Sequence, residues 1–207
     1  MQDFATGFEL NPTDELLAAQ AFFFFVAGGD TTANAMHFTL LELASHKTIL
    51  EKLHKEIDGI FKVGTEELTY NDIKKLTYLD KIINEALRMY PPIGSNQRIC
   101  TKDTVLPSKV RVEKNTIMIM PVFALHRDKK YYPNPNKFDP ERFSPENVTQ
   151  IPKYAFMPFG EGNRICIGAR FAKLQIKAAI AWLLRKFTLE EKDYKPERFE
   201  KGPFTIR

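Results

Sequence analysis

One segment, residues 11 to 45, constrains the fold of this chain most, because it reads as a single long helix with weak helix formers at its centre. Asn11 is the expected N-cap, followed by a proline at the first helical position and two acidic residues in the first turn. Apolar residues continue to Ser45, yet the central stretch VAGGDTTANAM, residues 26 to 36, holds two glycines, an aspartate and two threonines. A helix with such a centre requires a functional or structural reason for it.

Four consecutive phenylalanines, Phe22 to Phe25, make this helix apolar on nearly all sides, since successive residues turn by about 100° around the axis. Such a helix belongs at the centre of a large protein, and the remainder of the 207 residues is short for wrapping it. We therefore expect an open side, with at least one of these phenylalanines exposed. The most apolar run, Leu16 to Gly29, is shorter than the roughly 20 residues of a membrane span, so we expect a core helix that does not cross a membrane.

The rest of the chain predicts a mainly α fold with a small β-sheet. Apolar spacing, caps and prolines predict helices over residues 47–64, over a short segment opened by Asn71, over 78–90 and over 168–186. Residues 95–122 alternate and are β-branched, which favours a small sheet, and residues 127–160 form a proline-rich loop. No repeat or flexible linker interrupts the sequence, so we treat residues 1–207 as one unit.

Composition excludes several function classes. A net charge of +4 without a Lys/Arg-rich run gives no support for nucleic-acid binding. The two cysteines, Cys100 and Cys166, suggest no disulfide framework and suit a reducing compartment. The first residues lack the basic region and apolar run of a signal peptide.

The strongest motif is FMPFGEGNRICIGARFAKLQ, which contains Phe159, Gly162, Arg164, Cys166 and Gly168 as F-x-x-G-x-R-x-C-x-G before a helix. At average composition this pattern arises by chance in fewer than about one chain in ten thousand. A helix N-terminus favours a deprotonated thiolate, flanking glycines allow a tight turn, and the arginine can pair with a carboxylate. The full pattern argues against the alternative of a free cysteine that merely lies near a helix start.

This motif resembles the haem-ligand loop of the cytochrome P-450 family of haem-thiolate monooxygenases. The resemblance continues in order from AGGDTT through EALR and PERF to the loop, and so covers nearly the whole chain. It implies a haem with Cys166 as its axial cysteinate and metal ligand, where the thiolate favours O–O cleavage. It also implies that Arg98, in GSNQRIC, pairs with a haem propionate.

The same resemblance assigns a structural role to three charged residues. Glu85 and Arg88 form the family's E-x-x-R motif, and Arg142, in DPERF, completes a Glu-Arg-Arg cluster. Such a cluster would hold the long loop against the core and set the geometry behind the cysteine. Without the resemblance, an E-x-x-R pair would be read as an ordinary surface ion pair.

The centre of the long helix now has an explanation, because it resembles the family's oxygen-activating helix. Gly28 and Gly29 leave room for oxygen, and the Thr31 hydroxyl can bond to a carbonyl one turn earlier and open the helix for oxygen and water. Asp30 and Thr31 would then relay protons, which are their expected catalytic roles.

The cysteine loop and the histidines do not match two other kinds of site. A phosphate-binding loop lacks G-x-G-x-x-G and a Lys-Ser/Thr pair here. A zinc site lacks C-x-x-C or H-E-x-x-H, and the four histidines are scattered.

The resemblance also implies what the whole protein does. It predicts insertion of one oxygen atom from O2 into a lipophilic substrate, with electrons from an NADPH-dependent cytochrome reductase, at the cytoplasmic face of the endoplasmic reticulum membrane. Family members are roughly twice this length or more, so we expect the N-terminal half, with its membrane anchor, to be absent here. The alternative is a non-catalytic truncated fragment that retains the haem-binding motifs. Asn115 stands where a turn glycine is common and should tolerate a positive φ.

Overall fold

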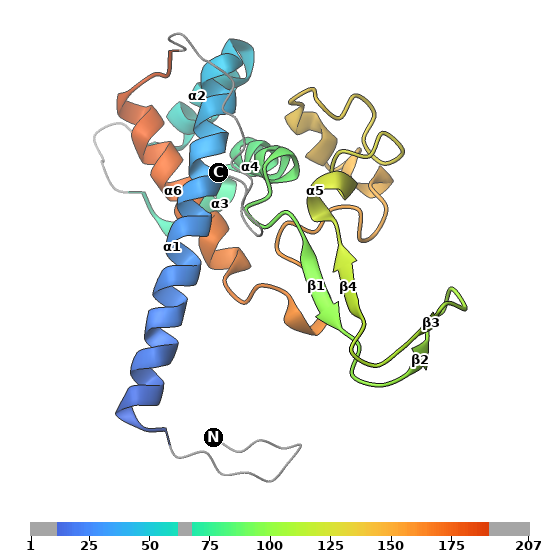
Figure 1. Cartoon of the computed structure of the whole chain (residues 1–207). Helices are drawn as coiled ribbons and strands as arrows, with labels where there is room; N and C mark the ends of the chain where they lie inside the picture. The colour runs from blue at the N-terminus through green and yellow to red at the C-terminus, as the bar shows by residue number, and fades with distance from the viewer. Residues whose placement is uncertain (1–11, 62–67, 191–207) are drawn as a thin grey trace.

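The computed structural model describes residues 12–61 and 68–190. This part is mostly helical with two small antiparallel sheets (Figure 1). The helices are α1 (Asp14–Ser45), α2 (Lys47–Ile60), α3 (Tyr70–Lys75), α4 (Thr77–Met89), α5 (Val122–Leu125) and α6 (Ala169–Lys186), with 3-10 turns η1 (Pro140–Phe143), η2 (Val148–Gln150) and η3 (Gly162–Arg164). The strands are β1 (Asn96–Ile99), β2 (Thr104–Val105), β3 (Arg111–Val112) and β4 (Ile117–Met120).

The hydrophobic core lies where α2, α4, α6 and the C-terminal half of α1 meet. Helices α2 and α4 each carry one apolar face at helical spacing, as the sequence predicts, and both faces turn inward. The fully buried members of the core include Leu43, Leu53, Ile57, Leu76, Leu79, Ile82, Ile83 and Ala181.

Helix α1 has two halves with different surroundings. Every residue from Asp14 to Asp30 is exposed, whereas burial against α4 and α6 begins at Thr31 and Thr32. Figure 1 shows the N-terminal half of α1 extending past α4 and α6. The expectation of at least one exposed phenylalanine is confirmed, because Phe22 to Phe25 are between 56% and 80% exposed.

The weak centre of α1 falls at the boundary between these halves. The Thr31 hydroxyl donates to the Ala27 carbonyl at 2.7 Å, as predicted. The helix nevertheless stays α-helical through Gly28 and Gly29, so the predicted opening of the helix is absent from this stretch. An i−4 hydroxyl bond is therefore accommodated here without breaking the helix.

By length and composition alone, α1 could cross a membrane, which differs from the expectation drawn from its most apolar run. The core helix of a soluble protein passes the same test. Only 6% of the apolar window is buried in the described structure, whereas Phe38, Thr39 and Leu43 in the second half of α1 are buried as in a core helix.

Two helix starts differ from the sequence prediction. Helix α1 begins at Asp14 with Thr13 as its cap, because the Thr13 hydroxyl accepts from the Leu16 amide at 3.3 Å; Asn11 lies outside the described residues. Helix α3 begins at Tyr70, not after Asn71, because Thr69 and Asp72 form a capping box. In both cases a threonine three residues before an amide takes the cap.

Helix α4 receives its N-terminal cap from another helix. Leu76 at the cap position has no side-chain group that can form a hydrogen bond, and the Glu56 carboxylate of α2 accepts from the Tyr78 and Leu79 amides at 2.7 and 3.0 Å. The negative charge also complements the positive end of the α4 dipole. This contact fixes α2 against the start of α4.

The single small sheet predicted over residues 95–122 is two separate two-stranded sheets. Strand β1 pairs antiparallel with β4, and β2 with β3. The Cys100 amide donates to the Thr116 carbonyl, and the Cys100 carbonyl accepts from the Asn115 amide. These bonds extend the β1–β4 pairing by one residue beyond β1. Asn115 adopts φ 69°, which confirms that this position requires a residue tolerant of positive φ.

Candidate functional site

The cysteine loop is a tight turn that leads into α6. The Cys166 amide donates to the Phe159 carbonyl at 2.9 Å and closes the loop between them. Gly162 has φ 76° and Gly160 has φ 75°, conformations that L side chains rarely adopt. Gly160 was not singled out by the motif, although it is as constrained as Gly162. Gly168, at φ −88°, is the cap of α6 and needs no glycine for its backbone.

The Cys166 side chain is exposed, and its two neighbours in the chain, Ile165 and Ile167, are exposed apolar residues. A Cβ added at Gly168 would lie 3.9 Å from the Cys166 sulfur, so the missing side chain keeps one side of the sulfur clear. Ile165, Ile167 and Phe171 are all more than half exposed in the same loop and the first turn of α6. An exposed thiol among exposed apolar side chains suits a flat apolar group bound through sulfur.

The two arginines expected near a haem carboxylate lie on separate elements. Arg98, on β1, is half-buried and donates to the Gln97 carbonyl at 2.8 Å, and Arg164, in η3, is exposed. Neither forms an ion pair or a hydrogen bond with Cys166 within residues 12–61 and 68–190. Both guanidinium groups therefore remain able to bind an anionic carboxylate.

The expected catalytic residues, Asp30 and Thr31, lie at the middle of α1. Asp30 is exposed and Thr31 is half-buried, and the Thr31 hydroxyl proton points to the Ala27 carbonyl. A Cβ added at Gly28 or Gly29 would meet nothing within 4 Å. The face of α1 that carries these glycines is thus open space in the described part of the chain.

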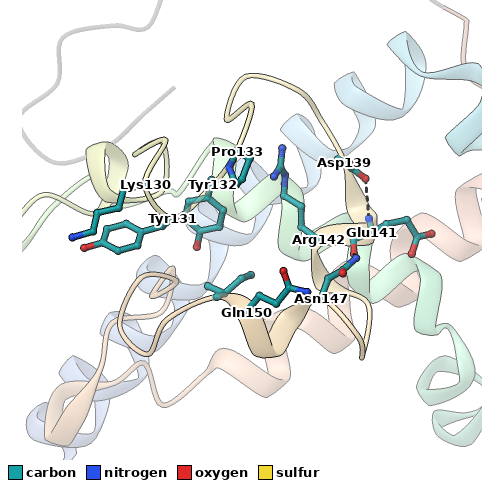
Figure 2. Close-up of a pocket in the computed structure, with 10 residues that line it drawn as sticks. Lys130, Tyr131, Tyr132, Pro133, Asp139, Glu141, Arg142, Asn147 and Gln150 are labelled. Atoms are coloured by element: carbon teal, nitrogen blue, oxygen red, sulfur yellow. Dashed lines mark hydrogen bonds between the residues drawn. The ribbon is translucent and has the colours of Figure 1, made fainter.

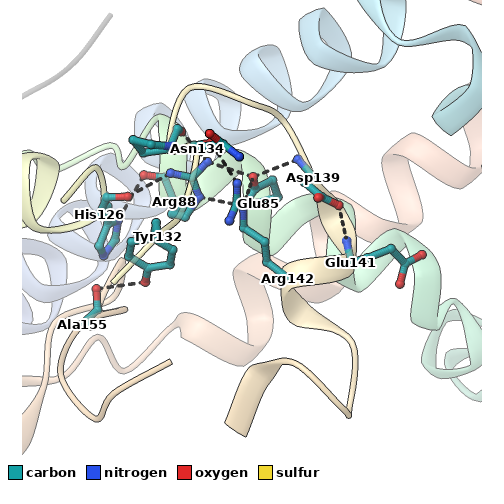
Figure 3. A network of polar contacts seen from close by, with 10 residues as sticks. Glu85, Arg88, His126, Tyr132, Asn134, Asp139, Glu141, Arg142 and Ala155 are labelled. Atoms are coloured by element: carbon teal, nitrogen blue, oxygen red, sulfur yellow. Dashed lines mark hydrogen bonds and ion pairs between the residues drawn. The ribbon is translucent and has the colours of Figure 1, made fainter. Parts of the chain in front are cut away.

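The structure brings Glu85, Arg88 and Arg142 together (Figure 3). The Arg88 guanidinium donates to both Glu85 oxygens at 2.7 and 2.8 Å, and Arg142 Nε donates to Glu85 Oε1 at 3.3 Å. The remaining Arg88 and Arg142 donors bind the backbone carbonyls of His126, Pro135 and Asn134. The cluster ties the proline-rich loop to α4.

The Glu85 carboxylate is fully buried at the centre of this cluster. It also accepts from the Asp139 backbone amide at 2.9 Å, so four donors surround it. Burial raises the pKa of Glu85, while Arg88, the Asp139 amide and Arg142 oppose that change. Removal of an arginine would leave the carboxylate without its main compensation.

His126 and Tyr132 belong to the same region, and the sequence reasoning missed both. The His126 ring bonds to the Arg88 carbonyl and the Met157 amide, and the Tyr132 hydroxyl donates to the Ala155 carbonyl at 3.0 Å. Burial lowers the pKa of His126 to about 4. The available signal was a histidine ending the apolar run VFAL, a position more typical of a core residue than of a metal ligand.

An open cavity of about 380 Å³ lies beside this cluster and away from the cysteine loop (Figure 2). It is lined by Lys130, Tyr131, Tyr132, Pro133, Asp139, Glu141, Arg142, Asn147, Gln150 and Ile151. Of the predicted site residues only Arg142 lines it. The cavity is a recess in the proline-rich loop, distinct from the Cys166 site.

The chain itself supplies few ligands for a metal at Cys166. Among the described residues, no group of three or more His, Cys, Asp or Glu side chains could hold a metal ion. A single exposed thiol in a glycine loop, amid apolar side chains and with arginines free for carboxylates, fits a metal held in an anionic macrocycle. The fold and this loop together suit a haem-binding protein.

Comparison with known proteins agrees with this class. The profile of the family described as cytochrome P450 matches residues 5–206, and the chain belongs to that family. Similar proteins include "Probable cytochrome P450 6a13" of Drosophila melanogaster, 42% identical over 93% of this chain, and cytochrome P450 6j1 of Blattella germanica, 45% identical over 82%. Cytochrome P450 6a2 of Drosophila melanogaster is 40% identical over 92% of the chain. The matches span 40%, 34% and 38% of the length of these relatives, respectively.

Proposed function

We propose that this chain carries the haem-thiolate site of a monooxygenase that inserts one oxygen atom from O2 into a lipophilic organic substrate. The observation that carries the proposal is the exposed Cys166 sulfur in a glycine loop at the start of α6, in a chain of the cytochrome P450 family. When haem is bound, its iron supplies the oxygen chemistry, and a cysteinate ligand favours O–O cleavage.

Several residues of this chain would have distinct roles in binding the haem. Cys166 holds the iron, Phe159, Gly162 and Gly168 shape the loop around the sulfur, and Arg98 and Arg164 bind the haem carboxylates. Their roles are supported by the exposed sulfur, the positive φ of Gly162 and the two available guanidinium groups.

Asp30 and Thr31 would deliver protons to the reaction. The Thr31 hydroxyl donates a hydrogen bond to the Ala27 carbonyl, so its oxygen lone pairs are left to accept a hydrogen bond from water. The neighbouring Asp30 side chain is exposed, so water can reach it. A positioned carboxyl, hydroxyl and water together form the chain that general acid catalysis needs.

The partners follow from the same proposal. Electrons would come from an NADPH-dependent reductase, at the cytoplasmic face of the endoplasmic reticulum membrane. The one-unit organisation of residues 1–207 belongs to the proposal as well. A second candidate, a non-catalytic chain that keeps the haem motifs, is favoured by the exposed phenylalanines of α1 and predicts haem binding without product formation.

The ligand assignment is tested by supplying haem to the chain and recording the reduced carbon-monoxide difference spectrum. We expect a thiolate-type band that Cys166→Ser abolishes and Cys100→Ser, at the buried cysteine, leaves in place. A band that survives Cys166→Ser and is lost in Cys100→Ser would overturn the assignment.

The proton-delivery role has a separate test in haem-loaded protein supplied with reductase and NADPH. Thr31→Ala should keep haem uptake but divert reducing equivalents to peroxide. Unchanged product per NADPH consumed would remove this role. Haem binding with no product in any variant would favour the non-catalytic candidate.

A further inference from the structure

His126 lies between α4 and the segment that leads into the cysteine loop, and it is fully buried. Its Nδ1 is 3.2 Å from the Arg88 carbonyl oxygen, and its Nε2 is 3.0 Å from the Met157 backbone nitrogen. A carbonyl can only accept a hydrogen bond and an amide can only donate one. The ring must therefore be neutral, with its proton on Nδ1 and with the Nε2 lone pair accepting from the Met157 amide.

Two hydrogen bonds connect His126 to Arg88 of α4. The ring donates to the Arg88 carbonyl, and the Arg88 guanidinium in turn donates to the His126 carbonyl at 2.9 Å. The same guanidinium holds the Glu85 carboxylate (Figure 3). The position of the imidazole is thus set by the buried Glu85–Arg88 pair.

The other side of His126 leads to the cysteine by backbone hydrogen bonds. The Met157 amide donates to the ring, the Met157 carbonyl accepts from Gly160 at 3.1 Å, and the Phe159 carbonyl accepts from Cys166 at 2.9 Å. The Phe156 ring stacks on the imidazole at 5.3 Å between centroids. His126 therefore contacts the segment that leads into the cysteine loop through the Met157 amide and the Phe156 ring.

We propose that His126 is a positioning residue for Cys166, whose Nδ1–H tautomer transmits the geometry of the Glu85–Arg88 pair to the Met157–Gly160 turn and hence to the cysteine loop. The inference rests on the proposed function only in taking Cys166 as the functional residue of that loop. Without an acceptor at Nε2, the buried Met157 amide loses its partner and the turn below it loosens.

Two substitutions separate the two ring nitrogens. His126→Gln places an amide oxygen near the position of Nε2, so it can still accept from Met157. His126→Asn places an amide nitrogen near the position of Nδ1, so it can still donate to the Arg88 carbonyl but does not reach Met157. Both variants lose the aromatic ring, so they are matched for the loss of packing against Phe156.

The test measures amide hydrogen exchange in the full chain loaded with haem. We expect the Gly160 and Cys166 amides to exchange at least tenfold faster in His126→Asn than in His126→Gln, while α2 and α6 exchange alike in both. The carbon-monoxide spectrum should keep its thiolate-type band in His126→Gln and lose part of it in His126→Asn. Equal exchange at Gly160 and Cys166 in the two variants would overturn the proposal.

A measurement on the unaltered chain guards against variants that fail to fold. Nitrogen-15 spectra of the imidazole should show a protonated Nδ1 and an unprotonated Nε2 at neutral pH. A proton on Nε2 would overturn the proposal without any substitution. Retention of the thiolate-type band by Cys166→Ser would instead overturn the proposed function, and neither the tautomer nor the exchange difference depends on that result.

Discussion

Arg88 and Glu85 face each other in two hydrogen bonds, Nε to Oε2 at 2.7 Å and Nη2 to Oε1 at 2.8 Å, and neither side chain is exposed to solvent. The guanidinium also reaches the carbonyls of His126 and Pro135, at 2.9 and 2.8 Å. Only a planar group with several fixed donors can meet these four acceptors at once. The pair is therefore a junction for the backbone around it as well as a charge pair.

Arg88→Met should lower the free energy of unfolding by about 3–5 kcal/mol, because it removes two of the four donors to the buried Glu85 carboxylate and leaves Arg142 as its remaining charged partner. Urea unfolding of the chain measures this loss. Arg111→Met is the matched control, since that side chain is 74% exposed, and it should change the free energy by less than about 0.5 kcal/mol. A loss below about 1 kcal/mol for Arg88→Met would contradict the junction role.

Glu56→Ala should destabilise the chain by about 1–3 kcal/mol, because the Tyr78 and Leu79 amides at the start of α4 lose their charged acceptor. The stability of Glu56→Gln should fall between those of the unaltered chain and Glu56→Ala, since an amide side chain offers one oxygen in place of two. Glu51→Ala, an exposed change on the same helix, is the control and should be near neutral. Equal effects of Glu56→Ala and Glu51→Ala would mean that α4 does not depend on this cap.

His126 should make stability depend on pH between about 6.5 and 4. Its pKa is lowered to about 4 in the folded chain, by burial first and by the charges of Arg88 and Arg127 as well, against about 6.5 when unfolded. In that window the unfolded chain binds a proton that the folded chain does not, so stability is lost as the pH falls. The total is about 3 kcal/mol, from 1.36 kcal/mol per pKa unit.

The measurement is the difference in unfolding free energy between the unaltered chain and His126→Gln from pH 7 to pH 4. The other histidines are present in both proteins, so their titration cancels. The penalty for His126→Gln should shrink as the pH falls through the window. A penalty that stays constant would show that the buried imidazole does not titrate as proposed.

Phe25 and Phe38 lie on the same helix, but their replacement by alanine should change the unfolding free energy by very different amounts. Phe38 is 4% exposed and stacks on Tyr90 at 4.4 Å, so Phe38→Ala should cost about 3–5 kcal/mol. Phe25 is 80% exposed, so Phe25→Ala should change the unfolding free energy by less than about 0.5 kcal/mol. Thermal or urea unfolding of the two variants decides this, and a large loss for Phe25→Ala would place it in a packed environment.

The sequence predicted those elements that local rules determine. Helices α2 and α4 followed from apolar periodicity, the end of α4 from Pro91, and the start of α6 from the glycine at 168. The cap of α1 was misplaced because Thr13, two residues after Asn11, is also a good cap residue, and its hydroxyl accepts from the Leu16 amide. Local patterns do not decide between two such neighbours.

Contacts between distant parts of the chain were beyond the sequence reasoning unless a motif named them. The Glu85, Arg88 and Arg142 cluster was found only through a known motif, and the Glu56 cap and the His126 link were missed. Glu56 lies 22 residues before Tyr78, and His126 lies 38 residues after Arg88. Neither pair leaves a periodicity or a spacing that a single sequence reveals.

The division of α1 into an exposed and a packed half has a consequence for motion. Most of the stability of a helix in a protein comes from packing of one face, which the exposed half of α1 lacks, and that half carries two adjacent glycines close to where packing begins. Opening of the N-terminal half would therefore expose little buried surface and need not disturb the core. Along this one unbroken helix, the protection of backbone amides from hydrogen exchange should rise steeply from Phe25 to Leu43, because only the C-terminal half is held by packing.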